Sequence, residues 1–266
     1  MTIESYWQLL LLGLALACGL QLGLWALQLR TGDATAVDAG WAVSLALLAV
    51  LYAILGPGGL EHRVLIAVTA GVASLRVAWV VLGRIGDGED GRYRELRLRW
   101  RQRDREQLSF FVFYQAQAVV AWALAVPFVL ISFNRSDGLD PLEWAGAALW
   151  LGAAVGEAVA DRQLARHRAD PARRGTTLRS GLWRYSRHPN YFFQWLLWVA
   201  YAVMALAAPW GWIGLLSPLL ILYLILFVTG IPPTEQQALA SRGEDYRRYQ
   251  RETSAFVPWF PKEPSA

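Results

Sequence analysis

Charged residues and cysteine are both scarce in this chain of 266 residues. Only 17% of the residues are charged, whereas soluble domains usually carry about 25%. The single cysteine, Cys18, excludes an internal disulfide and a cysteine metal cluster, so we expect it to pack as a small apolar side chain. The sequence also lacks a P-loop, a dinucleotide-binding glycine fingerprint and a paired-histidine metal motif, and we therefore expect no metal.

Long apolar runs account for much of the chain. Hydrophobic residues make up 55% of it and aromatic residues 13%, including 14 Trp. Runs of about 20 apolar residues are long enough to cross a bilayer as helices. The sequence predicts an all-α, multi-pass membrane bundle, a single integral membrane domain over residues 1–266 in contact with the lipid bilayer. The roughly seven expected transmembrane helices cover residues 7–29, 40–55, 65–81, 110–133, 144–160, 191–208 and 212–227.

Basic charge is concentrated in a few connecting segments. The net charge is +4 and the sequence pI is about 9.4, with almost all basic residues being Arg. The Arg residues gather in segments 84–105 and 162–187 and after residue 242, whereas the intervening loops have almost none. This asymmetry predicts an outside N-terminus and a cytoplasmic C-terminus, and it explains the high pI without a nucleic-acid partner. Segment 92–106 is expected to form a helix on the membrane surface or over a site.

A polar string precedes the sixth predicted span. It reads Arg187-His188-Pro189-Asn190-Tyr191. Proline is favoured at the first position of a helix, and backbone N–H groups at a helix start attract anions. A nucleotide phosphate would suit this corner. The alternative is a basic flank of the span beside a belt of interfacial aromatic residues.

The chain resembles a known family over most of its length. The 187–191 string resembles a signature shared by 5-alpha reductases, sterol reductases and isoprenylcysteine carboxyl methyltransferases. Segments 230–235, 243–249 and 256–261 resemble the tail of the same proteins. Segment 89–93, Glu-Asp-Gly-Arg-Tyr, resembles a mark of an uncharacterised, mostly bacterial branch of the steroid 5-alpha reductase C-terminal domain family, as do segments 38–41 and 75–76.

This resemblance implies an enzyme with a cytoplasm-facing cofactor pocket. Residues 134–266 would form the cofactor-binding part, residues 1–133 would supply the substrate-side helices, and a bacterial inner membrane would be the location. Reductase members bind NADPH, whereas methyltransferase members bind S-adenosylmethionine, and the tail alone does not choose between them. The matches at 89–93 and 38–41 favour the reductases, so NADPH is the expected cofactor.

Three polar residues follow one face of the fifth predicted helix. Glu157, Asp161 and Arg168 are spaced by four and seven residues, which places them along one side of a helix. Similar positions line the cofactor cleft of 5-alpha reductases. The carboxylates would hold ribose or amide groups and Arg168 a phosphate. A solvated helix end with intrahelical ion pairs is the alternative.

Charged residues inside or beside the third span form another group. Arg76 lies two turns inside that span, where an ionised side chain usually faces a polar interior, although a long Arg can also reach the interface. We assign Arg76 and Arg84 to the cofactor and expect Arg92 and Tyr93 to close over it. The cofactor-binding set that the resemblance implies is completed by Arg187, His188, Asn190, Tyr191, Gln194, Glu235, Tyr246 and Tyr249.

Asp38 and Tyr93 are the catalytic candidates. The resemblance implies a carboxylate that acts on the substrate carbonyl, and Asp38 is the nearest candidate, although a helix N-cap explains it equally well. The Gln-Glu pair of steroid-reducing members is absent. Trp41, Tyr114 and Gln115 are expected to bind the substrate, or in the last two cases to bridge helices by hydrogen bonds.

Three functions remain open at this point. The sequence favours an NADPH-dependent reductase that acts on a carbon–carbon double bond of a hydrophobic, enone-type small molecule. A membrane methyltransferase that uses S-adenosylmethionine is the first alternative. A non-enzymatic membrane protein, such as a transporter or scaffold, is the second.

Overall fold

The computed structural model describes residues 3–82 and 88–262, and within these ranges the regular structure is entirely helical. The all-α prediction is therefore confirmed. Residue contacts divide the chain into two compact units. Unit 1 comprises Met1–Glu143 and Met204–Gly214, and unit 2 comprises Trp144–Val203 and Leu215–Ala266. The predicted division of function at residue 133 stays a prediction, and Met204–Gly214, from the predicted cofactor-binding part, belongs to unit 1.

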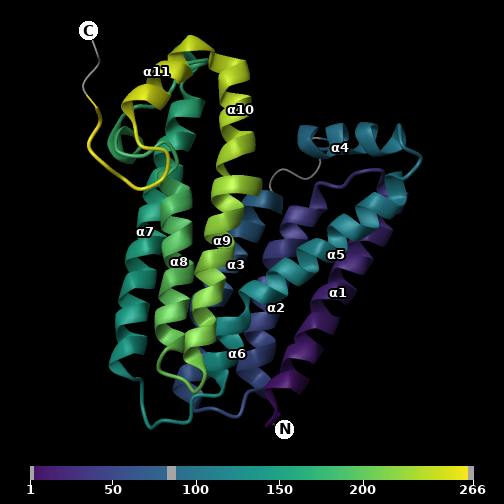
Figure 1. Cartoon of the computed structure of the whole chain (residues 1–266), viewed down its shortest axis with the longest axis vertical. Coiled ribbons are helices and arrows are strands. Elements are labelled where there is room, and N and C mark those ends of the chain that lie inside the picture. The colour runs from purple at the N-terminus through teal and green to yellow at the C-terminus, as the bar shows by residue number, and fades with distance from the viewer. Residues whose placement is uncertain (1–2, 83–87, 263–266) are drawn as a thin grey trace. The chain divides into compact units, whose positions relative to one another are not determined.

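Unit 1 is built around α2. Its helices are α1 (Tyr6–Thr31), α2 (Ala36–Leu55), α3 (Leu60–Leu82), α4 (Gly91–Arg101), α5 (Glu106–Leu124) and α6 (Val126–Ser132). Helix α2 packs against α1, α3 and α5, as Figure 1 shows. Its buried face is rich in alanine, with Ala39, Ala42, Ala46 and Ala49 almost fully enclosed. Small side chains allow the neighbouring helices to approach closely.

The turn between α1 and α2 sets the start of α2. Gly32 adopts a left-handed conformation with φ +69° and its N–H bonds to the carbonyl of Gln28, which closes α1. Asp33 Oδ1 then accepts the N–H of Thr35 at 2.8 Å. Because these bonds fix the entry to α2, they place Asp38 in the first turn of that helix.

A buried pair of hydrogen-bonded polar side chains, His62 and Glu143, lies elsewhere in unit 1. His62 Nδ1 is 2.7 Å from Glu143 Oε1, and both side chains are fully enclosed. The other Glu143 oxygen accepts the N–H of Asp140, and His62 Nε2 lies 3.1 Å from the carbonyl of Ser136. The pair is thus hydrogen-bonded on both sides, as a buried pair must be to offset its desolvation.

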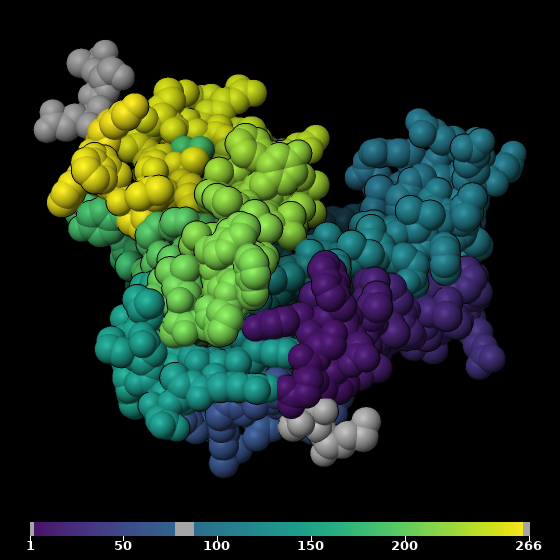
Figure 2. Space-filling view, turned by 60° about the horizontal axis from the view of Figure 1, so that its bottom comes forward, coloured from purple at the N-terminus to yellow at the C-terminus, as the bar shows by residue number. Residues whose placement is uncertain are grey.

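Unit 2 is a set of antiparallel helices with a folded C-terminal segment. It contains most of α7 (Pro141–Ala169), the short turns η1 (Pro171–Arg173) and η2 (Gly181–Arg184), α8 (Pro189–Ala205), α9 (Leu216–Tyr223), η4 (Leu224–Val228), α10 (Ile231–Arg242) and α11 (Glu244–Glu252). The short turn η3 (Gly211–Leu215) leads into α9. Figure 2 shows the yellow surface of α11 and the tail continuing into the yellow-green of α10.

The connection from α9 to α10 contains a π-helical turn. Pro232 and Pro233 have no backbone N–H, and a proline ring also clashes with the carbonyl four residues before it. The helix accommodates them by widening, so that the N–H groups of Thr229 and Gly230 both bond to the carbonyl of Leu224. This widening is the π-turn η4, and α10 then begins at Ile231 with the prolines in its first turn.

Four helical stretches are long and apolar enough to cross a membrane. They are Tyr6–Thr31, Ala36–Leu55, Glu106–Ser132 and Gly211–Arg242. They coincide with the first, second, fourth and last predicted spans, and they identify an integral membrane protein. Two of the other predicted spans lie within α3 and α7, and the predicted span at 191–208 overlaps α8, which ends three residues earlier, at Ala205. Segment 92–106, predicted as a surface helix, is helical from Gly91 to Arg101, and Glu106 begins α5.

Candidate functional site

The first polar cluster lies in unit 1, where α4 meets the start of α2. Asp90 caps α4 by accepting the N–H of Arg92 at 2.9 Å. Tyr93 then donates its hydroxyl to Asp38 Oδ1 at 2.5 Å, and Arg92 Nη2 donates to Asp38 Oδ2 at 2.9 Å. We call these three side chains the Asp38 cluster. The structure thus brings together both catalytic candidates and one predicted cofactor residue.

Burial and a neighbouring negative charge raise the pKa of the Tyr93 hydroxyl. The side chain is almost fully buried, and desolvation together with the negative charge of Asp38 raises the pKa of Tyr93 far above its ordinary value. The hydroxyl therefore remains protonated at neutral pH. Asp38 and Arg92 are more open, with side-chain exposures of 28% and 55%. The cluster is accordingly accessible from the Arg92 side.

A buried network of charged side chains lies next to the Asp38 cluster. Arg97 pairs with Glu89 at 2.7 Å and with Glu106 at 2.5 Å, and its guanidinium lies over the ring of Phe110 at 4.5 Å. Glu89 also accepts the N–H of Ala34, so the network ties α4 to the α1–α2 turn. Sequence reasoning missed Arg97 and Glu106, although Glu89 belongs to the motif at 89–93 and was a usable signal.

The predicted substrate residues lie at different depths in unit 1. Tyr114 is fully buried and packs in one apolar cluster with Tyr93, and its hydroxyl donates to the carbonyl of Ala34 at 3.4 Å. Gln115 has a buried Nε2 with no hydrogen-bond partner in the described part of the chain. Trp41 is half-buried. Arg76 is half-buried and has a protein partner, and Arg84 lies outside the described residues.

The second polar cluster lies in unit 2, where the tail meets the start of α8. Arg187 Nε donates to Glu235 Oε1 at 2.6 Å, and its Nη1 donates to the carbonyls of Gln250 and Thr253 at 3.0 and 2.5 Å. The Arg187 side chain is 11% exposed. Arg187 therefore connects the entrance of α8 to α10 and to the end of α11. Its role in holding a phosphate stays a prediction.

Glu235 is contacted by four polar side chains, two from the segment just before α8 and two from α11. His188 Nε2 lies 3.2 Å from Glu235 Oε1, Tyr246 donates to the same oxygen at 3.3 Å, and Gln250 donates to Oε2 at 2.8 Å. Together with Arg187 these residues form what we call the Arg187 network. Four of its members were predicted from the sequence. Gln250 was missed because one amide in a charged helix carries no distinctive signal.

Further predicted residues line the contact between α7 and α8. Asn190 donates to Asp161 at 3.3 Å. One turn earlier on α7, Gly156 lies directly under the ring of Phe193, where any side chain would overlap the ring. The next residue, Glu157, is buried. Asp161 thus contacts the start of α8, and the shared cofactor role of the two carboxylates stays a prediction.

The remaining predicted residues of unit 2 surround this contact. Tyr191 stacks on His188, with ring centroids 5.4 Å apart, and its hydroxyl is 3.1 Å from that of Thr234. Tyr249 is buried and donates to the carbonyls of Trp183 and Ser186. Gln194 is half-buried.

Two guanidinium groups act on the Asp245 carboxylate, and a third, Arg168 at the end of α7, lies near enough to one of them, Arg242, to repel it. Arg179 pairs with Asp245 at 2.7 Å, Arg242 acts electrostatically on Asp245, and Arg168 repels Arg242. We call Arg168, Arg179, Arg242 and Asp245 the arginine cluster. The Nε atoms of Arg179 and Arg242 and the hydroxyl of Thr177 are buried without a hydrogen-bond partner in the described chain. The cluster has two positive charges in excess and unsatisfied donors, which is the chemistry of an anion site.

We expect the arginine cluster to make stability depend modestly on pH. Burial acts to raise the pKa of Asp245, but the hydrogen bond from the backbone N–H of Thr177 and the charge of Arg179 outweigh it, so the pKa lies below its ordinary 3.8. The stabilisation is complete above pH 3.8 and is lost as the pH falls through the lower folded value. Because Asp245 is partly exposed, the effect is at most about 1 kcal/mol. Thermal unfolding of wild type and Asp245→Asn at pH 6 and pH 3 should converge at the lower pH; a constant difference would contradict this.

The comparisons place the chain in a family. It belongs to the family described as protein of unknown function (DUF1295), whose model matches residues 24–253. The matched range contains the Asp38 cluster, the Arg187 network and the arginine cluster. Neither the curated proteins nor the solved structures contained a match to this chain.

Proposed function

We propose that this protein is a membrane-embedded reductase that uses NADPH to reduce a carbon–carbon double bond in a lipid-soluble, enone-type substrate. The observation that carries the proposal is the arginine cluster, an anion site with two uncompensated positive charges beside the α7 and α8 residues that resemble a cofactor cleft. The resemblance to 5-alpha reductases supports the choice of reaction.

The proposed topology has seven membrane spans. They comprise the four apolar stretches together with α3, α7 and α8. The Arg-rich segments then share the cytoplasmic side of a bacterial inner membrane, and the N-terminus lies outside. This arrangement would give unit 2 a polar cytoplasmic end in contact with soluble nucleotide.

The donor set of unit 2 fits a phosphorylated dinucleotide. Arg168 is exposed and has no ion pair in the described chain, so it is available to hold a phosphate. A cation beside the ribose favours NADPH over NADH. Asp161 and Asn190 would bind ribose or amide groups, while Arg187 positions Glu235 and His188. When bound, NADPH supplies the hydride, and the chain supplies binding and orientation.

The Asp38 cluster would polarise the substrate. Tyr93 retains its proton, and its hydroxyl would turn from Asp38 to donate its single hydrogen bond to a substrate carbonyl oxygen. The Arg92 guanidinium would stabilise negative charge that develops on that oxygen. Tyr114 and Trp41 would contribute apolar surface for the substrate.

The proposal is tested by nucleotide binding to purified protein. NADPH is expected to raise the thermal transition of wild type, because a ligand stabilises the state that binds it. Arg168→Ala should weaken NADPH binding about 10- to 100-fold, which corresponds to the loss of a charge-assisted hydrogen bond. Arg173→Ala is the matched control, since Arg173 is an exposed arginine nearby that pairs only with Asp170 in the described chain.

Three outcomes are decisive against this function. Stabilisation by S-adenosylmethionine instead of NADPH would indicate a methyltransferase. No response to either nucleotide would indicate a non-enzymatic membrane protein. Equal weakening by Arg168→Ala and Arg173→Ala would show that NADPH binding does not use the arginine cluster.

A further inference from the structure

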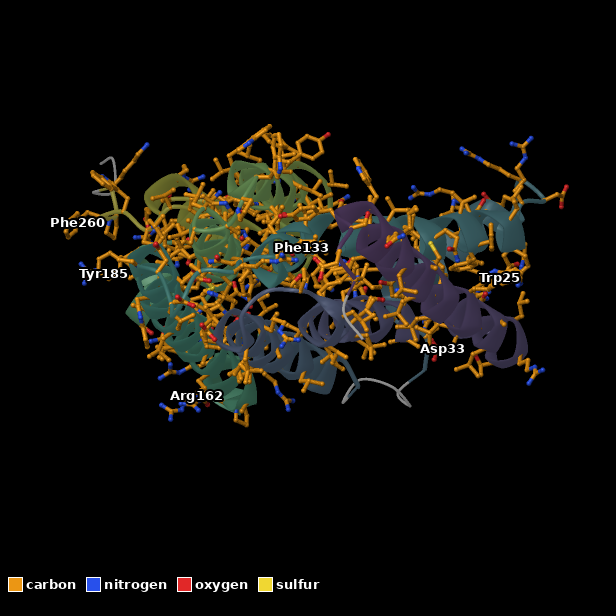
Figure 3. All side chains as sticks on the ribbon, turned by 90° about the horizontal axis from the view of Figure 1, so that it is seen from below. Trp25, Asp33, Phe133, Arg162, Tyr185 and Phe260 are labelled. Atoms are coloured by element: carbon orange, nitrogen blue, oxygen red, sulfur yellow. The ribbon has the colours of Figure 1, made fainter. Side chains whose placement is uncertain are left out.

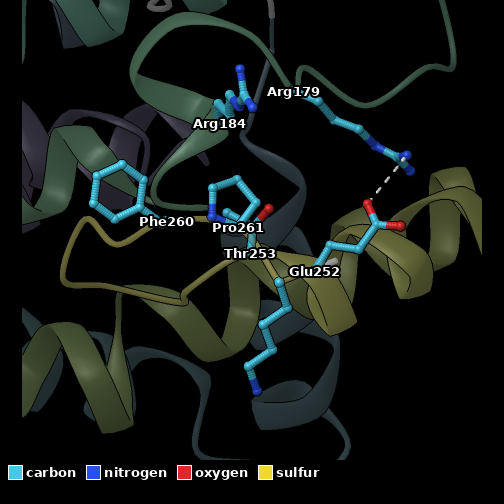
Figure 4. A pocket seen from close by; sticks show the side chains of 7 residues that line it. Arg179, Arg184, Glu252, Thr253, Phe260 and Pro261 are labelled. Carbon is cyan, nitrogen blue, oxygen red and sulfur yellow. Dashed lines mark ion pairs between the residues drawn. The ribbon is translucent and has the colours of Figure 1, made fainter. Parts of the chain in front are cut away.

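A pocket of about 460 Å³ lies between the loop before α8 and the C-terminal segment of unit 2. Arg179 and Arg184 line one side, and Glu252, Thr253, Phe260, Pro261 and Lys262 line the other (Figure 4). None of the predicted cofactor residues lines this pocket. One lining residue, Arg179, also belongs to the arginine cluster. The predicted cofactor site therefore does not account for this pocket.

The lining of this pocket is positively charged overall. Glu252 accepts Arg248 at 2.7 Å and lies 3.9 Å from Arg179, so its charge is already compensated. Arg184 and Lys262 are exposed and have no ion pair in the described chain. Two cations therefore remain without a protein anion on the pocket walls. An anionic ligand is the group that would neutralise them.

The rim of this pocket is aromatic and faces outward. Trp259 is 70% exposed and Phe260 is 76% exposed. Tyr185 meets Phe260 edge to face at 6.0 Å, and Figure 3 shows the two labelled side chains at the same edge of unit 2. Large exposed aromatic side chains beside cations are typical of the level at which a membrane protein meets lipid headgroups.

The contacts of the tail place this rim next to the start of α8. Phe256 packs on Phe192 and Trp195, with ring centroids 5.7 and 5.8 Å away, so it reaches the first two turns of that helix. The Trp259 N–H bonds to the Tyr185 carbonyl at 2.8 Å, four residues before α8 begins. The exposed rings therefore sit about one turn beyond the end of a helix that we count as a membrane span.

The same contacts make the site rigid. Ser186 Oγ donates to the carbonyl of Phe256 at 2.8 Å, and the Lys262 N–H bonds to the carbonyl of Glu252 at 2.8 Å. The tail is thus bonded to the α8 loop and to α11 on both sides of the aromatic residues. Binding a ligand at a preformed site avoids the entropy cost of ordering the segment.

We propose that this pocket binds the headgroup phosphate of an anionic phospholipid. Arg184 and Lys262 contact the phosphate, and Trp259 and Phe260 lie among the adjoining acyl chains and glycerol groups. A bound lipid holds the C-terminal segment against the membrane and fixes the depth of unit 2. This inference rests on the proposed topology, in which α8 spans the membrane, but not on the reductase chemistry, because none of these four residues was assigned to the cofactor or substrate.

Lipid retention by the purified protein tests this site. Native mass spectrometry in detergent, with added phosphatidylglycerol or phosphatidylcholine, should show preferential binding of the anionic lipid to wild type. Each basic residue near a membrane surface contributes about 1 kcal/mol to anionic lipid binding, so the double variant Arg184→Gln/Lys262→Gln should bind phosphatidylglycerol at least about tenfold more weakly. Both side chains are exposed, so an unchanged thermal transition without lipid would verify the fold.

The matched control removes the same charge elsewhere in unit 2. Arg173→Gln/Arg174→Gln changes two exposed arginines of the loop after α7, away from the pocket. This control should retain phosphatidylglycerol. Equal loss in both double variants would overturn the site in favour of diffuse charge attraction, and so would equal binding of the two lipids. Displacement of the lipid by NADPH or by inorganic phosphate would show that the pocket serves a soluble phosphate instead.

Discussion

Replacing Arg187 with alanine is expected to lower the free energy of unfolding by about 3–5 kcal/mol, the cost of removing one partner from a buried ion pair. The Arg187 side chain is 11% exposed and joins Glu235 to two backbone carbonyls of the tail. Its removal would leave the Glu235 carboxylate, 14% exposed, without its charged partner. The tail would also lose two of the bonds that hold it at α8.

The measurement is thermal or denaturant unfolding in detergent without nucleotide. Arg187→Lys should recover part of the loss, because an ammonium group keeps the charge but not the planar set of donors. Arg166→Ala, an exposed arginine on α7, should change stability by less than about 0.5 kcal/mol. If Arg187 served only as a phosphate contact, nucleotide-free stability would be unchanged by Arg187→Ala, and the structural role would be wrong.

Replacing Tyr93 with phenylalanine is expected to slow the proposed reduction by about 10²–10⁴-fold, the usual range for losing a positioned proton donor. Tyr93 donates a 2.5 Å hydrogen bond to Asp38, and its raised pKa keeps the hydroxyl protonated. Phenylalanine preserves the packing of the ring against Phe113 but removes that donor. NADPH binding should remain intact, because the proposed function assigns Tyr93 to the substrate and takes the cofactor contacts from Arg168, Asp161 and Asn190 of unit 2.

Turnover of an enone substrate and NADPH binding should be measured on the same preparation of Tyr93→Phe. Tyr52→Phe is the matched control, since Tyr52 is a fully buried tyrosine of unit 1 whose hydroxyl has no partner in the described chain. This control should retain wild-type turnover. If Tyr93→Phe kept its rate within about threefold, less than any positioned proton donor contributes, Tyr93 would be no more than a structural partner of Asp38.

Helix positions were largely predictable from the sequence, but interruptions within helices were not. The predicted spans at 7–29 and 40–55 correspond to α1 and α2 within a few residues. The span at 110–133 is divided into α5 and α6, because α5 ends at Leu124 and α6 begins at Val126 with Pro127 in its first turn. Hydropathy does not register such a break, because it follows from one proline and its hydrogen bonds.

The sequence predicted which residues belong to a polar site, but it did not predict which of them contact one another. The motifs at 89–93 and 187–191 indicated polar functional corners, and the structure places a compact polar cluster at each. The Arg242 side chain and the Gln250 amide were missed, because neither belongs to a recognisable pattern. The predicted phosphate contact at Arg187 illustrates the limit, since the sequence did not reveal that two of its nitrogens already have protein acceptors.

The amino-acid sequence by itself determined that the chain is helical, membrane-bound and divided into apolar spans and arginine-rich connections. These properties depend on the local spacing of apolar and charged residues, which any stretch of about 20 residues displays. Only the tertiary structure decided which charges neutralise one another. Glu235 is 48 residues from Arg187, and Asp38 is 55 residues from Tyr93. Such pairs form because helix packing brings distant segments together. That Arg168, Arg184 and Lys262 are among the cations without an ion pair in the described chain is likewise recognisable only from the structure.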